Sequence, residues 1–339
     1  RVVDLILNNK SKVVVTGMGA MTPLGQSVAE FWQGLVKGHS GVSHITLCDS
    51  SSFPCQIAGE VTGFDPDNYM DRRESVRMAR FSQLAVAAAG QALRNAELDI
   101  LKVDAERVGV LLGNGNGAFP TTEHGARALI EKGGMRVSPY FMPMILPNMA
   151  AAQVSRLFGA KGYSNTVCTA CAASTQAIGD AVEVISRGAA EVMITGGAEA
   201  GISQLGLAGF CTMRALSTRS QEPEKASRPF DAQRDGFVPG EGAGIIILES
   251  LDHALKRGVP ILAEVVGYGV SSDANSLVQP DEDGAGAARA MRWALDDAGL
   301  STAGIDYINA HGTSTTLNDA SETMAIKRVF GDLAYTIPV

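Results

Sequence analysis

The feature that most constrains the fold is a repeated alternation of short β-branched runs with longer helical segments along 339 residues. Strands are predicted at Lys12–Thr16, Val108–Leu112, Asn165–Val167, Glu191–Thr195, Ala243–Leu248, Ile261–Val270 and Ile305–Asn309. Helices are predicted at Ser27–Lys37, Arg80–Ala96, Ala150–Phe158, Thr175–Arg187, Asp252–Arg257, Ala285–Ala298 and Ala320–Phe330. Because such an alternation forms a parallel or mixed sheet covered by helices on both faces, the sequence predicts an α/β protein. Its length predicts two domains or a duplicated domain.

Charge and cysteine content argue against several classes of function. The formal net charge is −8 and no long basic run is present, which argues against a nucleic-acid-binding protein. Five cysteines without dense spacing predict no disulfide scaffold and therefore a reducing compartment. No apolar run reaches the roughly 18 residues of a membrane span. Cys168 and Cys171 have no second pair of Cys or His nearby, so zinc is not expected.

The glycine-rich segment Gly17–Thr22, GMGAMT, is similar to a phosphate-binding loop but lacks its third glycine. Thr22 stands at that position, and Pro23 follows directly. We therefore interpret the segment as a turn after the first strand, where backbones pack tightly, and not as a nucleotide site.

The segment Ser164–Val182, SNTVCTACAASTQAIGDAV, places Cys171 between a short strand and the start of a helix. The unpaired N–H groups and positive dipole of a helix start stabilise a thiolate and can hold an oxyanion. The small residues after Cys171 leave room for a substrate. Local sequence leaves two interpretations, a nucleophile or a buried, inert cysteine. Cys168 precedes the helix, and we expect it to be structural and to point into the strand layer.

A second candidate lies in Ile308–Asp319, INAHGTSTTLND, where His311 follows a predicted strand. The C-terminal ends of strands are where α/β folds build active sites. A histidine there can donate a hydrogen bond to a thioester carbonyl, although a lone histidine is more often structural. Thr313 and Thr315 are predicted to bind a polar arm of a substrate or to cap the following helix.

With TACAAS and NAHGTST in this order and at this separation, the chain resembles the β-ketoacyl-acyl carrier protein synthases, most of all their condensing enzyme II group. The resemblance runs from Lys12 to Val339 and includes VVVTGMGAMTPLG, ISRGAAEVMITGGAEA, LAGFCTMRALSTR, SRPFDAQRDGFVPGEGAG and DGAGAARAM. It implies a thiolase-like αβαβα fold made of two duplicated halves, residues 12–258 and an incomplete 259–339. It also implies a homodimer.

The resemblance implies a chemistry for these residues. Cys171 would accept an acyl chain from an acyl carrier protein, and malonyl carrier protein would then lose carbon dioxide and attack the thioester. The product would be a 3-oxoacyl carrier protein of fatty acid biosynthesis. His311 matches the histidine that polarises the malonyl thioester carbonyl. Thr313 and Thr315 match threonines that contact malonate or the pantetheine arm.

No organic cofactor is implied, but the backbone at Asn309 and Ala310 matches a monovalent cation site of some members. Two departures from the family pattern stand out. Val278 replaces a threonine expected near SDANSLV. The family continues with a lysine, a second histidine and a glycine-rich gating loop, whereas this sequence stops at Val339. We therefore expect a truncated sequence that is inactive and poorly folded as it stands, and we assign the implied function to the full-length protein.

Basic residues cluster in the segment MDRRESVRMAR, where Arg73, Arg77 and Arg80 recur at helical spacing. The plain interpretation is a solvated helix face. Because the chain is otherwise acidic and carrier proteins are acidic, the resemblance favours carrier-protein docking at Arg72, Arg73 and Arg77. Weaker docking candidates are Lys132, Arg136 and Arg214.

Three alternatives to the synthase stay open. They are a polyketide-type ketosynthase, a non-decarboxylative thiolase-like acyltransferase and an inactive chain-length partner subunit. The presence of Cys171 argues against the last of these. The expected location is the cytoplasm, or the plastid or mitochondrial matrix in a eukaryote, with neither nucleic acid nor membrane as a partner.

Overall fold

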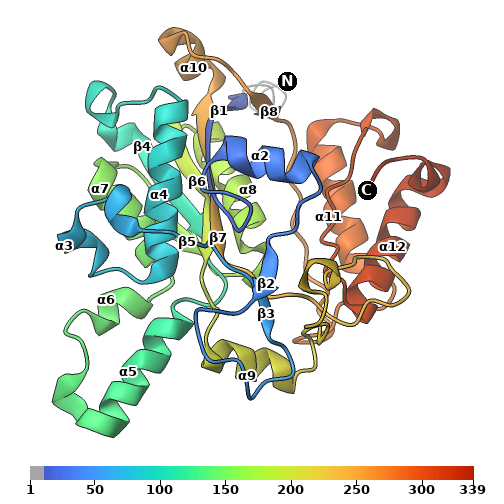
Figure 1. Cartoon of the computed structure of the whole chain (residues 1–339). Coiled ribbons are helices and arrows are strands. Elements are labelled where there is room, and N and C mark those ends of the chain that lie inside the picture. Colours follow the sequence, from blue (N-terminus) through green and yellow to red (C-terminus); the bar gives the residue numbers. More distant parts are fainter. Residues whose placement is uncertain (1–10) are drawn as a thin grey trace. The chain divides into compact units, whose positions relative to one another are not determined.

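The computed structural model describes residues 11–339 (Figure 1). By their internal contacts these residues form two compact units. The first comprises the described part of Arg1–Ser50 with Ala58–Ala208 and Pro239–Val265, and the second comprises Ser51–Ile57, Gly209–Val238 and Val266–Val339. We describe each unit by itself. The division into halves at residue 258 stays a prediction.

The first unit is built on a mixed six-stranded sheet with the strand order β5-β4-β6-β7-β1-β8. The strands are β1 (Val13–Met21), β4 (Val108–Gly113), β5 (Ser164–Val167), β6 (Val192–Glu199), β7 (Gly242–Ser250) and β8 (Ala263–Val265). β4 runs parallel to β5 and β6, whereas β7 is antiparallel to β6 and β1. The predicted mixed sheet is confirmed, and its three parallel strands end at one common edge.

Helices cover both faces of this sheet (Figure 1). α4 (Arg80–Asn95) and α7 (Met149–Phe158) pack on one face, and α8 (Ala173–Ser186) packs on the other. The side chains of β4 show the division, because Val110 packs with the α4 cluster and its neighbour Leu111 with the α8 cluster. This alternation is that of a strand buried on both faces.

The first strand is longer than predicted. Gly17 and Gly19 lie inside β1 and not in a turn. A Cβ atom on Gly19 would lie 2.0 Å from the carbonyl oxygen of Ala88 in α4, and one on Gly17 would lie 2.4 Å from that of Ala92. The predicted turn is therefore wrong, since these glycines continue the strand. The predicted tight backbone packing is confirmed, because the glycines let α4 approach the sheet.

The other helices and strands are α2 (Val28–Val36), β2 (Val42–His44), β3 (Ile57–Gly59), α3 (Arg72–Ser75), α5 (Phe119–Lys132), α6 (Phe141–Ile145), α9 (Gln204–Thr212) and α10 (Leu251–Arg257). Among the described residues, no helix combines the length and apolarity needed to cross a bilayer.

The second unit contains α11 (Ala285–Ala298) and α12 (Thr316–Phe330), which pack closely. A Cβ atom on Gly284, just before α11, would lie 2.4 Å from the Ser321 carbonyl oxygen. The predicted strand Ile305–Asn309 is wrong, because these described residues form no strand. The Ile308 amide donates one hydrogen bond to the Pro338 carbonyl, at 3.0 Å, and a single bond does not make a ladder.

The other strand predicted in this region is shorter than expected. Of Ile261–Val270, only β8 is a strand, and it pairs with the edge of β1 in the first unit. The residues that follow belong to the second unit, where the Tyr268 amide donates to the carboxylate of Asp297 and not to a neighbouring strand.

Candidate active site

Cys171 lies in a strand-to-helix turn at the edge where the parallel strands of the first unit end. β5 ends at Val167, a short 3-10 turn spans Ala170–Ala172, and α8 begins at Ala173. Cys171 is exposed, so the interpretation as a buried cysteine is wrong. Its predicted place between strand and helix is confirmed.

Two glycines allow the start of α8 to sit directly on the strand ends. A Cβ atom on Gly113, the last residue of β4, would lie 2.3 Å from the backbone nitrogen of Ser174. A Cβ atom on Gly197 of β6 would lie 1.9 Å from the hydroxyl oxygen of Ser174. The first turn of α8 is therefore fixed against β4 and β6, and it holds the Cys171 turn in place.

A half-buried carboxylate organises the loop beneath this turn, which the sequence did not reveal. Glu199, at the end of β6, accepts hydrogen bonds from the amides of Gly115 and Asn116, each at 3.0 Å. Burial raises the pKa of Glu199, although the hydrogen bonds from these amides oppose the shift. Asn114 completes the loop, because its side chain donates to the Ala198 carbonyl and accepts from the Gly117 amide.

Cys168 does not lie where the sequence predicted. It is exposed and does not point into the strand layer. The reason is that β5 is an edge strand that ends at Val167, so Cys168 follows the last ladder position. Its sulfur lies 3.8 Å from the carbonyl oxygen of Gly115.

Two other thiols of the described chain are held in their protonated form. Burial, reinforced by the charges of Glu123, Glu60 and Asp49, raises the pKa of Cys48 to about 11. Burial also raises the pKa of Cys55, which is fully enclosed. These thiols are therefore poor nucleophiles at neutral pH.

His311 lies in an exposed loop of the second unit, and a carboxylate holds its backbone. Glu322 of α12 accepts hydrogen bonds from the amides of His311, at 2.7 Å, and Gly312, at 2.8 Å. Gly312 has a positive φ of 47°, a conformation that suits glycine. The Glu322 carboxylate thus fixes the backbone of the loop, while His311 itself is an exposed residue.

A second acid, Asp319, fixes the remainder of the same loop. Its buried carboxylate accepts from the amides of Phe230 and Ser314 and forms an ion pair with Arg234. The Ser314 hydroxyl accepts from the Arg228 amide, at 3.0 Å. Ser314 is fully buried at a φ of +65°, so these contacts hold a strained residue in place.

Thr313 and Thr315 lie together in this loop. Their hydroxyl oxygens are 2.9 Å apart. Thr315 is the N-cap of α12 and accepts a hydrogen bond from the Asn318 amide, which confirms the predicted capping. The Thr313–Thr315 pair stays a candidate substrate contact. Cys171 and His311 belong to different compact units, and each is described within its own.

The basic segment does not form the single helix that its spacing predicted. α3 ends at Ser75, Arg77 lies in the connection that follows, and α4 begins at Arg80. Arg80 is also not available for docking, since its guanidinium binds the buried Glu241 carboxylate through bonds of 2.6 and 2.7 Å. Arg73 is exposed, and Arg77 lies over the ring of Tyr140, 5.0 Å from its centroid.

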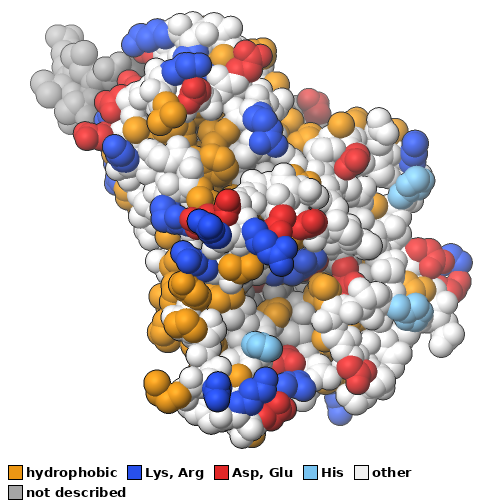
Figure 2. Space-filling view, turned by 60° about the vertical axis from the view of Figure 1, so that its left-hand side comes forward, with side chains coloured by type: hydrophobic (Ala, Val, Ile, Leu, Met, Phe, Trp, Pro, Cys, Tyr) orange, Lys and Arg blue, Asp and Glu red, His pale blue; other side chains and the backbone are white. Residues whose placement is uncertain are grey.

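Basic side chains gather in two groups, one midway and one at the bottom, on the face that carries α3 and α5 (Figure 2). Arg72 and Arg73 are exposed on α3, and Lys132 and Arg136 are exposed at the end of α5 and just after it. Arg214 is exposed in the second unit.

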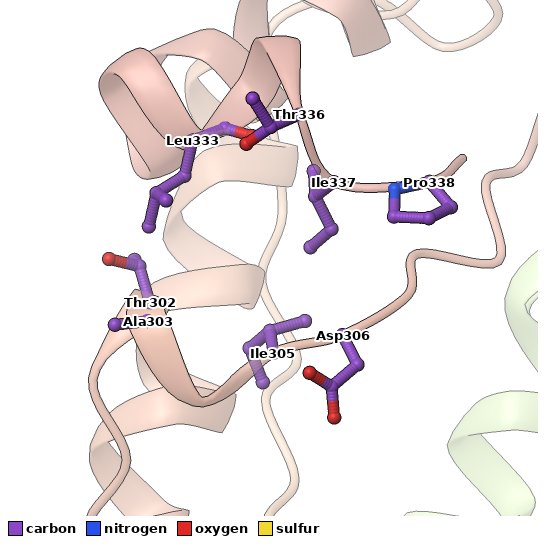
Figure 3. A pocket seen from close by; sticks show the side chains of 8 residues that line it. All are labelled: Thr302, Ala303, Ile305, Asp306, Leu333, Thr336, Ile337 and Pro338. Atoms are coloured by element: carbon purple, nitrogen blue, oxygen red, sulfur yellow. The ribbon is translucent and has the colours of Figure 1, made fainter.

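A pocket of about 220 Å³ lies in the second unit (Figure 3). It is lined by Thr302, Ala303, Ile305, Asp306, Leu333, Thr336, Ile337 and Pro338. None of these is a candidate catalytic residue, and Asp306 is the one charged side chain among them. The pocket therefore adds no chemistry to the candidate site.

The mixed α/β fold places an exposed cysteine, a candidate nucleophile, at a strand-to-helix turn. The chain belongs to the β-ketoacyl synthase family, because residues 10–254 match its N-terminal domain and residues 262–339 its C-terminal domain. The 3-oxoacyl-[acyl-carrier-protein] synthase 2 of Synechocystis sp. is 48% identical over 330 residues, which are 97% of this chain and 79% of the relative.

Solved structures of ketosynthases share the thiolase-like fold. A β-ketoacyl synthase from Burkholderia phymatum STM815 is 37% identical with a TM-score of 0.88, and the match covers 95% of this chain and 78% of the other. A ketosynthase solved with a type II polyketide acyl-carrier protein and bound to a hexaketide is 35% identical with a TM-score of 0.87. That match covers 97% of this chain and 80% of the other.

Proposed function

We propose that the protein is a 3-oxoacyl-acyl carrier protein synthase that extends acyl chains in fatty acid biosynthesis. The observation that carries the proposal is the exposed Cys171 on a turn fixed between strand ends and α8. The relative of Synechocystis sp., whose name states this activity, is 48% identical over nearly the whole chain.

The proposed reaction has two transfers. The Cys171 sulfur attacks the thioester of an acyl carrier protein, which leaves as a thiol, and a thioester to Cys171 remains. Malonyl carrier protein then loses carbon dioxide, and the carbanion at its α carbon attacks the acyl carbonyl. The new carbon–carbon bond yields a 3-oxoacyl carrier protein, and Cys171 is released as a thiolate.

The loop of the second unit is proposed to serve the second transfer. His311 is proposed to donate a hydrogen bond to the malonyl thioester carbonyl as negative charge develops there. The Glu322 carboxylate fixes the backbone of His311, which supports this role, because a hydrogen-bond donor stabilises charge best when it does not have to reorganise. The Thr313–Thr315 hydroxyl pair is proposed to contact malonate or the pantetheine arm.

A monovalent cation at the carbonyls of Asn309 and Ala310 is part of the proposal. Oxygen donors such as these carbonyls suit such an ion, and the Glu322 carboxylate fixes the neighbouring backbone by accepting a hydrogen bond from the His311 amide. The ion would stiffen the loop.

The proposed partners are an acyl carrier protein and a second copy of the chain. One neighbouring structure is described as an acyl-carrier protein in complex with its ketosynthase, and the exposed basic residues on α3 suit an acidic carrier.

The edge of the sheet suits the second copy. β5 is the outer strand of the sheet, and its Ser164 and Asn165 are exposed. Such an edge suits pairing with the same strand of a second copy. The free cysteines suit a reducing location such as the cytoplasm.

The experiment incubates the full-length protein with acyl carrier protein loaded with a saturated acyl chain and maps the modified peptide by mass spectrometry. We expect the acyl mass on Cys171 and, after malonyl carrier protein is added, its release as 3-oxoacyl product with carbon dioxide. Cys171→Ala should abolish both steps, whereas Cys48→Ala should change neither. An acyl group on Cys168, or no acylation at all, would contradict the assignment. Repeated extension of one chain would favour a polyketide-type ketosynthase, the class of the 35% identical structure.

A further inference from the structure

Two exposed thiols lie three positions apart at the candidate active site. Cys168 and Cys171 are separated by Thr169 and Ala170, and both side chains are exposed. The function proposed above uses only the second of them. A C-x-x-C spacing at the start of a helix is the arrangement of redox-active cysteine pairs.

The backbone between the two cysteines turns back on itself. In an extended chain their Cα atoms would lie roughly 10 Å apart, too far for a disulfide, which needs about 4.4–6.8 Å. Here Thr169 has φ −126° and ψ 44°, and Ala170 has φ +50°, so neither residue is extended. The Ala172 amide also donates to the Thr169 carbonyl, at 3.1 Å, which closes the turn.

Cys168 and the backbone next to Cys171 also approach the same residue, Gly115. The sulfur of Cys168 lies 3.8 Å from the carbonyl oxygen of Gly115. A Cβ atom on Gly115 would lie 3.3 Å from the carbonyl oxygen of Ala170, the residue bonded to Cys171. The Cys168 sulfur and the backbone that leads into Cys171 therefore meet at one glycine. The Glu199 carboxylate accepts a hydrogen bond from the Gly115 amide, so the position of Gly115 does not depend on a bound substrate.

We propose that Cys168 and Cys171 form a reversible intramolecular disulfide that withdraws the nucleophile from acyl transfer. The oxidant is a low-molecular-weight disulfide such as oxidised glutathione. The Cys171 thiolate attacks one of its sulfurs, the S–S bond breaks, and one small thiol leaves. The Cys168 thiolate then attacks the Cys171 sulfur and displaces the second small thiol. The protein loses two thiol protons and two electrons, and the small disulfide gains both.

Two other thiols, Cys48 and Cys55, serve as internal controls for oxidation at neutral pH. Cys48 has a pKa of about 11, and Cys55 is fully buried. A thiol that stays protonated or enclosed exchanges slowly with disulfides. Oxidation at neutral pH should therefore spare Cys48 and Cys55.

The test treats the full chain with oxidised glutathione and measures intact mass and disulfide-linked peptides. We expect the wild-type protein to lose the mass of two hydrogens and to yield a Cys168–Cys171 linked peptide, and dithiothreitol to reverse the change. Cys168→Ala should instead keep a stable glutathione adduct on Cys171, because no second thiol resolves it. Cys48→Ala should behave as wild type. A wild-type adduct as persistent as that of Cys168→Ala would overturn the proposal.

Formation of the disulfide does not depend on the proposed function; only its expected effect, the loss of acyl transfer, rests on that function. The two proposals can therefore fail separately. In the oxidised wild type, acyl transfer should fall about tenfold or more and return after reduction, because a disulfide sulfur is no nucleophile. In Cys168→Ala the reduced protein should still accept the acyl group. Acylation without any linked peptide would overturn the disulfide alone. A linked peptide in a protein that never accepts an acyl group would overturn the proposed function alone.

Discussion

The carboxylate of Glu322 holds the backbone of His311, whose amide lies 2.7 Å from one of its oxygens. The second oxygen accepts from the Gly312 amide, so one side chain fixes two successive peptide units. Glu322 is only 9% exposed and lies on α12, a regular helix of the second unit. The position of the candidate catalytic histidine therefore depends on a helix that begins five residues after it.

Replacing Glu322 should separate the two transfers of the reaction. Glu322→Gln keeps one acceptor oxygen for two amides, so the His311 loop should shift. We expect condensation to slow roughly 10- to 100-fold, because small misplacements of catalytic groups cost that much. Acyl transfer to Cys171 should be unchanged. The two rates are measured by acyl mass on Cys171 and by carbon dioxide release.

The matched control for this change is Glu224→Gln, which alters an exposed glutamate of the same unit. It should leave both rates as in the wild type. Normal condensation by Glu322→Gln would show that the loop holds its position without this carboxylate.

The strand-end glycines should be intolerant of a methyl group. In Gly113→Ala the new Cβ would lie 2.3 Å from the Ser174 nitrogen, so the start of α8 must move away from β4. We expect a loss of about 1–3 kcal/mol in the free energy of unfolding, as for an overpacked core, together with slower acylation of Cys171. Gly244→Ala, in the same sheet but with open space around its Cβ, is the control and should be neutral in urea denaturation. Equal stability of the two variants would contradict this account.

The sequence predicted much of the first unit and less of the second. The buried strands of the sheet and α4, α7 and α8 were predicted within a few residues, because their apolar runs are unambiguous. The exposure of Cys168 was not predicted, since whether this residue is buried or exposed depends on β5 being an edge strand. That order is a tertiary property that the local pattern does not record.

The carboxylates that position the candidate site were not predicted either. Glu199 and Glu322 act by accepting backbone hydrogen bonds from residues far along the chain or around a loop. Neither stands in a motif whose spacing signals such a role. The predicted strand Ile305–Asn309 failed for a related reason, because an apolar run becomes a strand only where a neighbour completes its ladder.

Acid should destabilise the first unit through Glu249, which is fully buried between β1, β7 and α10. Burial alone would raise its pKa, but hydrogen bonds from His253, Thr16 and Arg257 outweigh burial and lower the pKa below its ordinary 4.5. The folded protein thus binds this proton more weakly than the unfolded chain. The contribution to stability is present above pH 4.5 and is lost as the pH falls towards the folded pKa.

Urea denaturation at a series of pH values checks this prediction. Glu249→Gln should be less stable by about 3 kcal/mol or more at pH 7, because it leaves Arg257 without its buried partner. Its stability should also fall less steeply with acid than that of the wild type. Glu131→Gln, on the exposed end of α5, should keep the wild-type pH dependence. Parallel curves for wild type and Glu249→Gln would rule out Glu249 as the titrating group.

Arg80 and Arg73 should differ sharply although both belong to the basic segment. Arg80→Met leaves the Glu241 carboxylate, 5% exposed, buried without its counterion, and should cost about 3 kcal/mol. Arg73→Met removes an exposed side chain and should change the free energy of unfolding by no more than about 0.5 kcal/mol. Urea denaturation of both variants distinguishes a structural from a surface arginine. Similar losses would contradict the division made here.

Charge reversal on the surface arginines should weaken carrier-protein binding without touching the chemistry. In the triple variant Arg72→Glu, Arg73→Glu and Arg77→Glu, three positive charges that face solvent become negative and repel an acidic carrier. We expect a higher apparent KM for the acyl carrier protein, most marked at low salt, where surface charges are least screened. The alkylation rate of Cys171 should stay the same, because the turn that holds it is built by β4, β6 and α8. Lys256→Glu, an exposed reversal on α10, is the control for a charge reversal outside this segment and should leave KM unaltered. If the triple variant keeps the wild-type KM at low salt, the carrier docks elsewhere.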